Sequence, residues 1–408
     1  MASPPLNVAI IGAGLSGLSL ALALHQQGIS CVLYERNSAP LNIGGAVMLS
    51  PNALKVLEAL LVYSRIKTKG YNFETLEYRD VDGKLLEVYE FGGEEKYGYK
   101  ALRIYRTALI EELMVMLREK GVNIVFGKKF VKVLEETDEG VSWEFADGTR
   151  ETAGLLVGAD GIHSAVRKYL YPDLKPTFAG GMGVTAAVPT EQLKLPLGYH
   201  IPVTISTPHG SFVIAPQEVN GSEVLIGKQK RVAKGHDRAG WDAISADKEA
   251  LVKFLQQGTE NFPEFVQNAV SSIPHGKINV WPFYIVPKLE RWTSEKLRVI
   301  ILGDGAHAIP PSAGQGINQA FEDIYIFALL LGQAGRVGMQ DALKFWQEYR
   351  QQRIEKVMEL NAQIEFRRMM EEEKAKMPVD SMKEIELSWL YKPNFKADVD
   401  SWVAARTN

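Results

Sequence analysis

The sequence predicts an α/β fold in which a parallel-sheet domain is interrupted by an inserted sheet, mixed or antiparallel, and followed by a helical C-terminal tail. Compact apolar runs at residues 7–12 and 297–302 are typical of buried parallel strands. Between them, from about residue 177 to 230, proline and glycine interrupt short stretches with little helical period, which favours antiparallel strands. From residue 314 onward the pattern is mainly helical.

The composition of the chain favours a well-packed protein. Its 408 residues suit one large domain or two interlocked ones, and 46% of them are hydrophobic. A net charge of −3 provides no basic excess for nucleic acid. The single cysteine, Cys31, fits a reducing compartment, and the apolar run 324–331 is shorter than the ~20 residues that a membrane span needs. Because no secretory leader is visible either, we expect a soluble, cytoplasmic protein without a membrane anchor.

The N-terminal segment is predicted to form a βαβ unit. Residues 7–12 form an apolar strand that ends in glycine, residues 15–28 follow a helical pattern that stops at Gly28, and residues 29–35 are apolar again. A strand, a helix and a strand in this order are typical of a Rossmann-like nucleotide-binding domain.

The first turn of this unit reads Gly12-Ala-Gly14-Leu15-Ser16-Gly17 and matches the GxGxxG motif. Gly12 permits the tight turn, Gly14 lets the backbone approach a pyrophosphate, and Gly17 lets helix and sheet pack closely. The helix N-terminus supplies N–H donors for the phosphates. The motif therefore predicts a dinucleotide site, but it does not distinguish NAD from FAD.

An acidic residue ends the second strand of the unit. Glu35 stands 18 residues after Gly17, close to the ~20-residue spacing expected for a ribose-binding acid. Its carboxylate can accept hydrogen bonds from both hydroxyls of the adenosine ribose.

Further helical and strand patterns occupy the next part of the chain. Residues 107–120 read as an amphipathic helix, and residues 122–134 and 141–146 alternate like strands. Residues 155–158 form a short apolar run that enters a glycine-rich segment.

A second ligand-binding segment follows the strand at 297–302. This strand delivers Asp304 to its C-terminal tip, where α/β sheets bind ligands, and an acid there can accept from the ribityl hydroxyls of a flavin. Gly314 and Gly316 allow a backbone to lie against a flat ring. A helix that begins near these glycines would point its N–H dipole at the pyrimidine end of that ring.

A third segment lies between these two and reads Gly158-Ala-Asp160-Gly161, continuing to Arg167. With these three motifs, in this order and at these spacings, the chain resembles the single-component (group A) FAD-dependent monooxygenases, the family of salicylate hydroxylase and zeaxanthin epoxidase. The resemblance covers residues 7–350 and is strongest at 7–36, 155–167 and 297–331.

The resemblance implies an FAD site, and the residues carried over to it share a place in one of the family's motifs or beside the flavin. They are Gly12, Gly14, Leu15, Ser16, Gly17, Glu35, Arg36, Gly45, Ala46, Arg106, Asp160, Asp304, Pro311, Gly314, Gly316, Ile317 and Asn318. Arg36 and Arg106 would lie near the pyrophosphate or ribityl chain, and Gly45 would pass close to the isoalloxazine. Asp160 would serve both FAD and the nicotinamide coenzyme.

The chemistry implied by the resemblance is oxygen insertion. NADPH (or NADH) would bind transiently and reduce FAD, and dioxygen would then form a flavin C4a-hydroperoxide that an electron-rich ring or alkene attacks. The absence of a second GxGxxG motif fits transient coenzyme binding. We therefore expect an enzyme that hydroxylates or epoxidises a small aromatic or alkene-containing molecule, with no metal.

The predicted domains interleave along the chain. The FAD-binding domain takes residues 1–75, 101–176 and 288–360, the substrate-binding sheet takes 76–100 and 177–287, and the helical tail takes 361–408. Substrate is expected between the flavin and the inserted sheet. No catalytic group is identified, and the weak candidates there are His200, His209, Tyr199 and Tyr284, each of which reads more simply as structural.

One departure from the family bears on the substrate. Many members carry an arginine on a sheet strand just before a Val-Pro step, where it pairs with an acidic or phenolic substrate. Here residues 184–189 read Val-Thr-Ala-Ala-Val-Pro, without arginine, which favours a neutral substrate.

Two alternative functions stay open. Residues 281–287 partly match the WxWxIP segment of flavin-dependent halogenases. A protein of this fold can also bind its ligand without redox turnover of FAD. A monomer and a homodimer are both compatible with the sequence.

Overall fold

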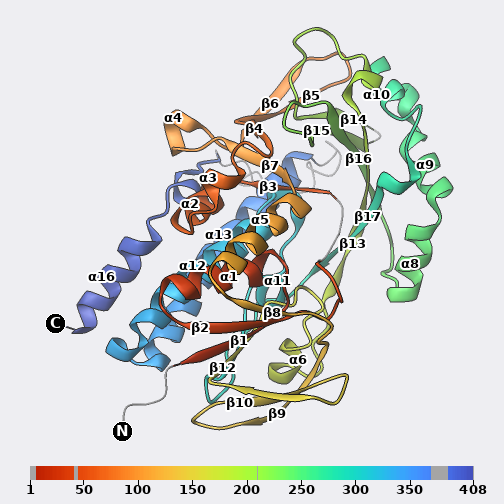
Figure 1. The fold of residues 1–408 in the computed structure, drawn as a ribbon. Coiled ribbons are helices and arrows are strands. Elements are labelled where there is room, and N and C mark those ends of the chain that lie inside the picture. The colour runs from red at the N-terminus through yellow and green to blue at the C-terminus, as the bar shows by residue number, and fades with distance from the viewer. Residues whose placement is uncertain (1–5, 41–44, 209, 369–384, 408) are drawn as a thin grey trace.

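The computed structural model describes residues 6–40, 45–208, 210–368 and 385–407. These residues form four sheets, of which a five-stranded and a seven-stranded sheet carry the architecture (Figure 1). The α/β class, the inserted mixed sheet and the helical C-terminal part are all confirmed.

The five-stranded sheet is parallel and has the order β18-β12-β1-β2-β8. Its strands are β1 (Asn7–Ile11), β2 (Ser30–Tyr34), β8 (Asn123–Val125), β12 (Leu155–Gly158) and β18 (Val299–Ile301). Helix α1 (Leu15–Gln26) packs against α5 (Arg106–Glu119) and α12 (Gly316–Val337). The predicted βαβ unit and the predicted strands at 155–158 and 297–302 are therefore present, with ends shifted by one or two residues.

The seven-stranded sheet has the order β17-β13-β16-β15-β14-β5-β6. Its strands are β5 (Thr75–Arg79), β6 (Leu85–Glu90), β13 (Thr177–Pro189), β14 (Val203–Thr207), β15 (Gly210–Pro216), β16 (Glu223–Arg231) and β17 (Ile278–Ile285). All neighbours pair antiparallel except β14 and β5, which are parallel, so the sheet is mixed. The exact boundaries of the predicted domains stay a prediction.

One face of the seven-stranded sheet is covered by helices that the sequence analysis did not identify. These are α8 (Arg238–Ala246), α9 (Lys248–Gln256) and α10 (Glu264–Ala269), on the outer side of the sheet in Figure 1. Val184, Ile226 and Phe212 point into the apolar cluster between sheet and helices and are fully buried. The opposite face of the sheet turns toward the rest of the molecule.

Two three-stranded sheets complete the β-structure. The first joins β3 (Ala46–Leu49), β7 (Ala101–Tyr105) and β4 (Tyr71–Phe73), with β7 in the middle. The second joins β9 (Phe130–Glu136), β10 (Val141–Phe145) and β11 (Arg150–Ala153).

The C-terminal part packs on the nucleotide-binding half. Helix α12 contacts α2 (Pro51–Ala59), α13 (Met339–Arg368) and α16 (Phe395–Thr407), while α15 (Ser388–Tyr391) contacts α2. Part of the predicted tail, residues 369–384, lies outside the described residues. Within the described ranges, no helix combines the length and apolarity that crossing a membrane requires.

A buried ion network joins α12 to α13. Arg350 Nε donates to Asp323 Oδ1 at 2.7 Å, and Arg350 Nη1 pairs with Glu322, all three side chains being fully buried. Arg353 Nε and Nη2 donate to the two oxygens of Glu322 at 2.6 and 2.9 Å. Burial opposes ionisation of Asp323, but the charges of His307 and Arg350 outweigh it and lower its pKa.

Replacing Asp323→Asn should lower the free energy of unfolding by about 3–5 kcal/mol at pH 7, because Arg350 keeps a buried charge without that partner. Since the folded pKa of Asp323 is depressed, its contribution is complete above the ordinary aspartate pKa and is lost as the pH falls through the folded value. Urea unfolding of both proteins from pH 7 to pH 3 should therefore show a shrinking difference.

The matched control is Asp400→Asn, which breaks an exposed pair with Lys396 and should cost less than about 1 kcal/mol at any pH. A difference for Asp323→Asn that does not change with pH would contradict the role assigned to its charge.

Candidate active site

The GxGxxG turn follows β1, and close contacts explain why two of its positions require glycine. Gly12 has φ +107°, and a Cβ atom there would lie 2.6 Å from the carbonyl oxygen of Ala159, which ends the neighbouring strand segment. A Cβ atom on Gly17 would lie 1.9 Å from the carbonyl oxygen of Gly12. Gly14, in contrast, has nothing within 4 Å of its Cβ position, so the turn is open on the side where a ligand would approach.

Glu35 is tied to this turn. Its Oε2 accepts from the backbone N–H of Ala13 at 3.0 Å, and its Oε1 accepts from the backbone N–H and side-chain amide of Asn37. The side chain is 8% exposed. These bonds fix the orientation of the carboxylate beside the turn, and Oε2, which accepts one of them, keeps a lone pair for a further donor.

The Asp-Gly segment meets the turn from β12. Asp160 Oδ2 accepts from the backbone N–H groups of Ala165 and Val166, at 2.7 and 3.2 Å. Asp160 Oδ1 is buried, and no described residue is its hydrogen-bond partner. Burial raises the pKa of Asp160, although these hydrogen bonds act in the opposite direction. Arg167 is 2% exposed, and its guanidinium donates to the carbonyl oxygens of Gly305 and Ile162, so it fastens this segment to the Asp304 segment.

Arg36 is exposed and follows β2, so it lies at the same end of the five-stranded sheet as the Asp-Gly segment. Burial, followed by the positive charges of Arg167, Arg36 and Arg238, lowers the pKa of His163 in the Asp-Gly segment. Arg36 and the Asp-Gly segment therefore face the same region of space.

Asp304 begins the short helix α11 (Asp304–His307) directly after β18. Its side chain is accessible to solvent, yet surrounding protein raises its pKa, an effect that the charges of His307 and Arg106 oppose. The same burial lowers the pKa of Arg106, and Asp304 opposes that shift.

The start of β3 lies against the start of α5. The backbone N–H of Arg106 donates to the carbonyl oxygen of Gly45 at 3.2 Å, and Ala46 pairs with Tyr105 across the β3–β7 ladder. The Arg106 guanidinium lies 5.9 Å from the ring of Trp281 on β17, and its buried Nε has no partner within the described ranges. Gly45 and Arg106 thus lie where the nucleotide-binding half meets the seven-stranded sheet.

The segment from Pro311 to Asn318 lies beside β3 at the same place. Pro311 begins a single 3-10 turn that ends at Gly314, which has φ +63°. Gly316 and half-buried Ile317 open α12, and the Cβ position of Gly316 has open space around it. The Asn318 side chain is fully buried; it accepts from Ser50 N and donates to Met48 O, so it holds β3 rather than facing open space.

These residues fit FAD. They provide open space beside Gly14 and Gly316, an accessible carboxylate at Asp304, and polar atoms without partners on Asp160 and Arg106. We propose the role of each single residue toward FAD from this arrangement.

The weak catalytic candidates lie outside the three motifs, although the ring of Tyr284 lies 6.0 Å from that of His163 in the Asp-Gly segment. Tyr199 and Tyr284 pack against the apolar cluster under α8–α10, on the far face of the seven-stranded sheet. Tyr284 Oη accepts from Trp241 Nε1, and His200 Nε2 lies 3.1 Å from the carbonyl oxygen of Thr75 near the β5 edge. His209 lies outside the described residues. We therefore propose no catalytic role for Tyr199, Tyr284 or His200.

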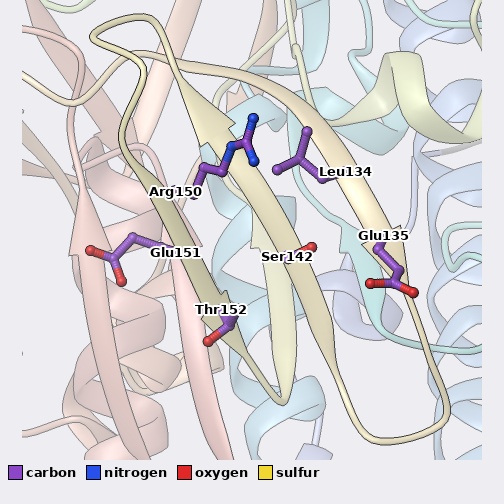
Figure 2. Close-up of a pocket in the computed structure, with 6 residues that line it drawn as sticks. All are labelled: Leu134, Glu135, Ser142, Arg150, Glu151 and Thr152. Atoms are coloured by element: carbon purple, nitrogen blue, oxygen red, sulfur yellow. The ribbon is translucent and has the colours of Figure 1, made fainter.

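A separate hollow of about 620 Å³ lies on the sheet β9-β10-β11 (Figure 2). Its lining side chains come from these strands and are Leu134, Glu135, Ser142, Arg150, Glu151 and Thr152. None of them belongs to the three motifs, and most are exposed, so this open surface hollow is not the candidate active site.

Sequence reasoning missed Arg103 and Gln217, which lie together beside the site. Arg103 is 7% exposed and its Nη2 donates to Gln217 Oε1 at 3.0 Å. The available signal was an arginine inside the otherwise apolar strand Ala101–Tyr105.

The variants Gly17→Ala and Gly14→Ala should separate folding from cofactor binding. Gly17→Ala must move α1 away from Gly12 and should lower the free energy of unfolding by roughly 1–3 kcal/mol. Gly14 has φ −82°, which alanine adopts freely, so Gly14→Ala should unfold like the wild type, within about 0.5 kcal/mol, when FAD is absent. It should nevertheless weaken FAD binding roughly tenfold, because a methyl group would occupy the approach to the turn.

The measurements are thermal unfolding of the FAD-free proteins and titration with FAD by fluorescence. Equal FAD affinity for Gly14→Ala and wild type would contradict the assignment of the open side of the turn.

Comparison with known proteins agrees with this geometry. A family model described as an FAD binding domain matches residues 5–361. The 3-amino-4-hydroxybenzoate 2-monooxygenase PtnB3 of Streptomyces platensis is 31% identical over 362 residues, which cover 86% of this chain and 85% of the relative. The 6-hydroxynicotinate 3-monooxygenase of Bordetella bronchiseptica is 24% identical and covers 87% of this chain and 90% of its own.

Solved structures share the fold. The crystal structure of CtdE in complex with FAD and a substrate has a TM-score of 0.80 at 21% identity and covers 98% of both chains. Klebsiella pneumoniae HpxO complexed with FAD and uric acid has a TM-score of 0.77 at 21% identity, over 98% of this chain and 97% of its own. With the three motifs assembled at one sheet edge, the chain belongs to the single-component FAD-dependent monooxygenases.

Proposed function

We propose that this enzyme uses NADPH or NADH and dioxygen to hydroxylate or epoxidise a small aromatic or alkene-containing molecule. The observation that carries the proposal is a set of partly exposed side chains next to the three motifs. They lie on the inner face of the seven-stranded sheet, and we place the substrate between this face and the strands β3 and β7.

The inner face of the sheet is underpacked compared with its outer face. Thr185, Val213, Leu225 and Trp281 share this inner face through the strand register, and all keep partial exposure. On β13, β15 and β16, side chains one residue along the strand are almost completely buried under α8–α10. Apolar and small side chains that stay accessible between two sheets are typical of a ligand pocket.

Contacts show that this face looks onto β3 and β7. The Cβ position of Gly45 lies 3.8 Å from the Trp281 ring, and Arg103 of β7 reaches Gln217 beyond the end of β15. A substrate between these elements would lie against the segment that the family places beside the isoalloxazine.

Each part of the site would have a definite task. The turn at Gly12–Gly17 and Glu35 would hold the adenosine end, Asp304 the ribityl chain, and the start of α12 would lie against the ring. When bound, FAD supplies the redox chemistry: it takes up electrons from the nicotinamide coenzyme and activates dioxygen. The apolar inner face would exclude water, which promotes loss of hydrogen peroxide instead of oxygen transfer.

The relatives support an aromatic substrate. 3-Amino-4-hydroxybenzoate and 6-hydroxynicotinate, named as substrates of two relatives, are hydroxylated aromatic rings. We further propose a monomer or homodimer in the cytoplasm, which the single cysteine, Cys31, supports through its fit to a reducing compartment.

The purified protein should be yellow, and one class of ring compounds should accelerate its NADPH oxidation in air. Under ¹⁸O₂ the product should carry one labelled oxygen atom, detected by mass spectrometry, because a monooxygenase takes one atom from dioxygen. Phenols, indoles and alkenes form the test panel, and unlabelled air with H₂¹⁸O is the control.

Label from water rather than dioxygen would overturn the proposal. A bound flavin that neither coenzyme reduces would favour the ligand-binding alternative. A product that forms only with added chloride or bromide would favour the halogenase.

A further inference from the structure

Arg103 is a buried arginine without a carboxylate partner. Its side chain is 7% exposed, and within the described ranges its hydrogen bond is to the neutral amide of Gln217. Its Nε is buried and has no hydrogen-bond partner among the described residues. Burial lowers the pKa of Arg103 to about 10, although the neighbouring Tyr105 acts in the opposite direction.

Other buried arginines of this chain are compensated. Arg350 contacts Glu322 and Asp323, and Arg353 contacts Glu322 through two nitrogens. Arg167 donates to two backbone carbonyl oxygens. An arginine carries five N–H donors, and burying its charge without a partner costs several kcal/mol, so the position of Arg103 calls for a further acceptor.

The strand register places Arg103 at the proposed substrate space. Arg103 pairs with Met48 on β3 and with Tyr71 on β4, and its side chain shares their face of this sheet. That face reaches the large sheet, since Arg103 contacts Gln217. Ala46, expected beside the isoalloxazine, lies two residues along β3 from Met48, or roughly 7 Å. A long arginine side chain spans most of that distance.

A chain of hydrogen bonds holds Gln217, the hydrogen-bond acceptor of Arg103, in place. Gln217 Nε2 lies 3.4 Å from Tyr105 Oη, and Tyr105 Oη donates to Glu223, which also pairs with Lys277. These contacts orient the Gln217 amide so that its oxygen faces Arg103. The guanidinium is thus held in one orientation before any ligand arrives, which is how a binding site is preorganised.

We propose that Arg103 binds a carboxylate of the substrate, so that the enzyme acts on an aromatic carboxylic acid. This inference rests on the proposed function and names its substrate class. It replaces the expectation of a neutral substrate, which considered only residues 184–189 of β13. The arginine comes instead from β7, on the opposite wall of the same space. A planar guanidinium binds a carboxylate through two parallel N–H···O bonds, and a buried site strengthens them.

Matched pairs of probes test this proposal without turnover. The pairs are 4-hydroxybenzoate with 4-hydroxybenzamide, 6-hydroxynicotinate with its amide, and 3-amino-4-hydroxybenzoate with its amide. Binding is measured from the change in the absorption spectrum of the bound flavin. At least one acid should bind the wild type about 10- to 100-fold more tightly than its amide. If no acid outbinds its amide, the proposal is overturned before any variant is made.

The variant Arg103→Gln should abolish this preference while amide binding changes less than about threefold. Arg103→Lys, which keeps the charge and loses the planar fork, should retain a part of it. Arg298→Gln is the matched control, because Arg298 also has a buried Nε without a partner but bonds Asp138 on the far side of the nucleotide-binding half. It should bind every probe as the wild type does.

An unchanged preference in Arg103→Gln overturns the proposal. If that variant does not fold, the ratio of acid to amide affinity is compared between Arg103→Lys and the wild type, and an equal ratio overturns the proposal. Oxygen transfer is measured separately, so failure of the monooxygenase proposal can be distinguished from failure of the carboxylate site at Arg103. Loss of ¹⁸O incorporation with an intact acid preference would reject the monooxygenase and leave the carboxylate site, whereas ¹⁸O incorporation into an amide or hydrocarbon alone would reject the carboxylate site.

Discussion

The arrangement of the candidate site depends on one buried carboxylate, that of Asp323. Its Oδ2 accepts from the backbone N–H of Gly303 at 2.9 Å and lies 2.5 Å from His307 Nε2, while its Oδ1 accepts from Arg350 Nε. These contacts tie both ends of the Asp304 segment to α12 and α13. Because the carboxylate is fully buried, its ionised form depends on these partners, and it helps in turn to hold them in place.

The fixed Asp304 segment in turn aligns the other two motifs. Arg167 spans from the Asp-Gly segment to Gly305, and the Gly12 turn lies against Ala159. The Cβ position of Gly303 lies 3.5 Å from Ser16 Oγ. Three segments that are distant in sequence therefore meet at the carboxyl ends of β1, β12 and β18, where a parallel sheet offers its ligand site.

The chain treats buried positive charge in two ways. At Arg350 the charge is matched by two carboxylates, and the result is a rigid joint between helices. At Arg103 the described part of the chain supplies a neutral amide oxygen and no carboxylate. The first arrangement stabilises the fold by itself, whereas the second leaves a stabilising interaction to be made by a ligand. An unmatched charge is destabilising in the free protein, so it marks a place where binding has most to contribute.

The sequence by itself determined the βαβ unit, the roles of Gly12 and Gly17, and the delivery of Asp304 by a buried strand. These features depend on local spacing, because a turn between a strand and a helix involves residues that are neighbours in the chain. Only the tertiary structure decided which side chains share the substrate space. Tyr199 and Tyr284 turned out to face α8–α10, while Arg103 faces the inner side. Successive residues of a strand point to opposite faces. Which face becomes the inner one is set by contacts with residues far along the chain, such as the hydrogen bond between Arg103 and Gln217, which are 114 positions apart.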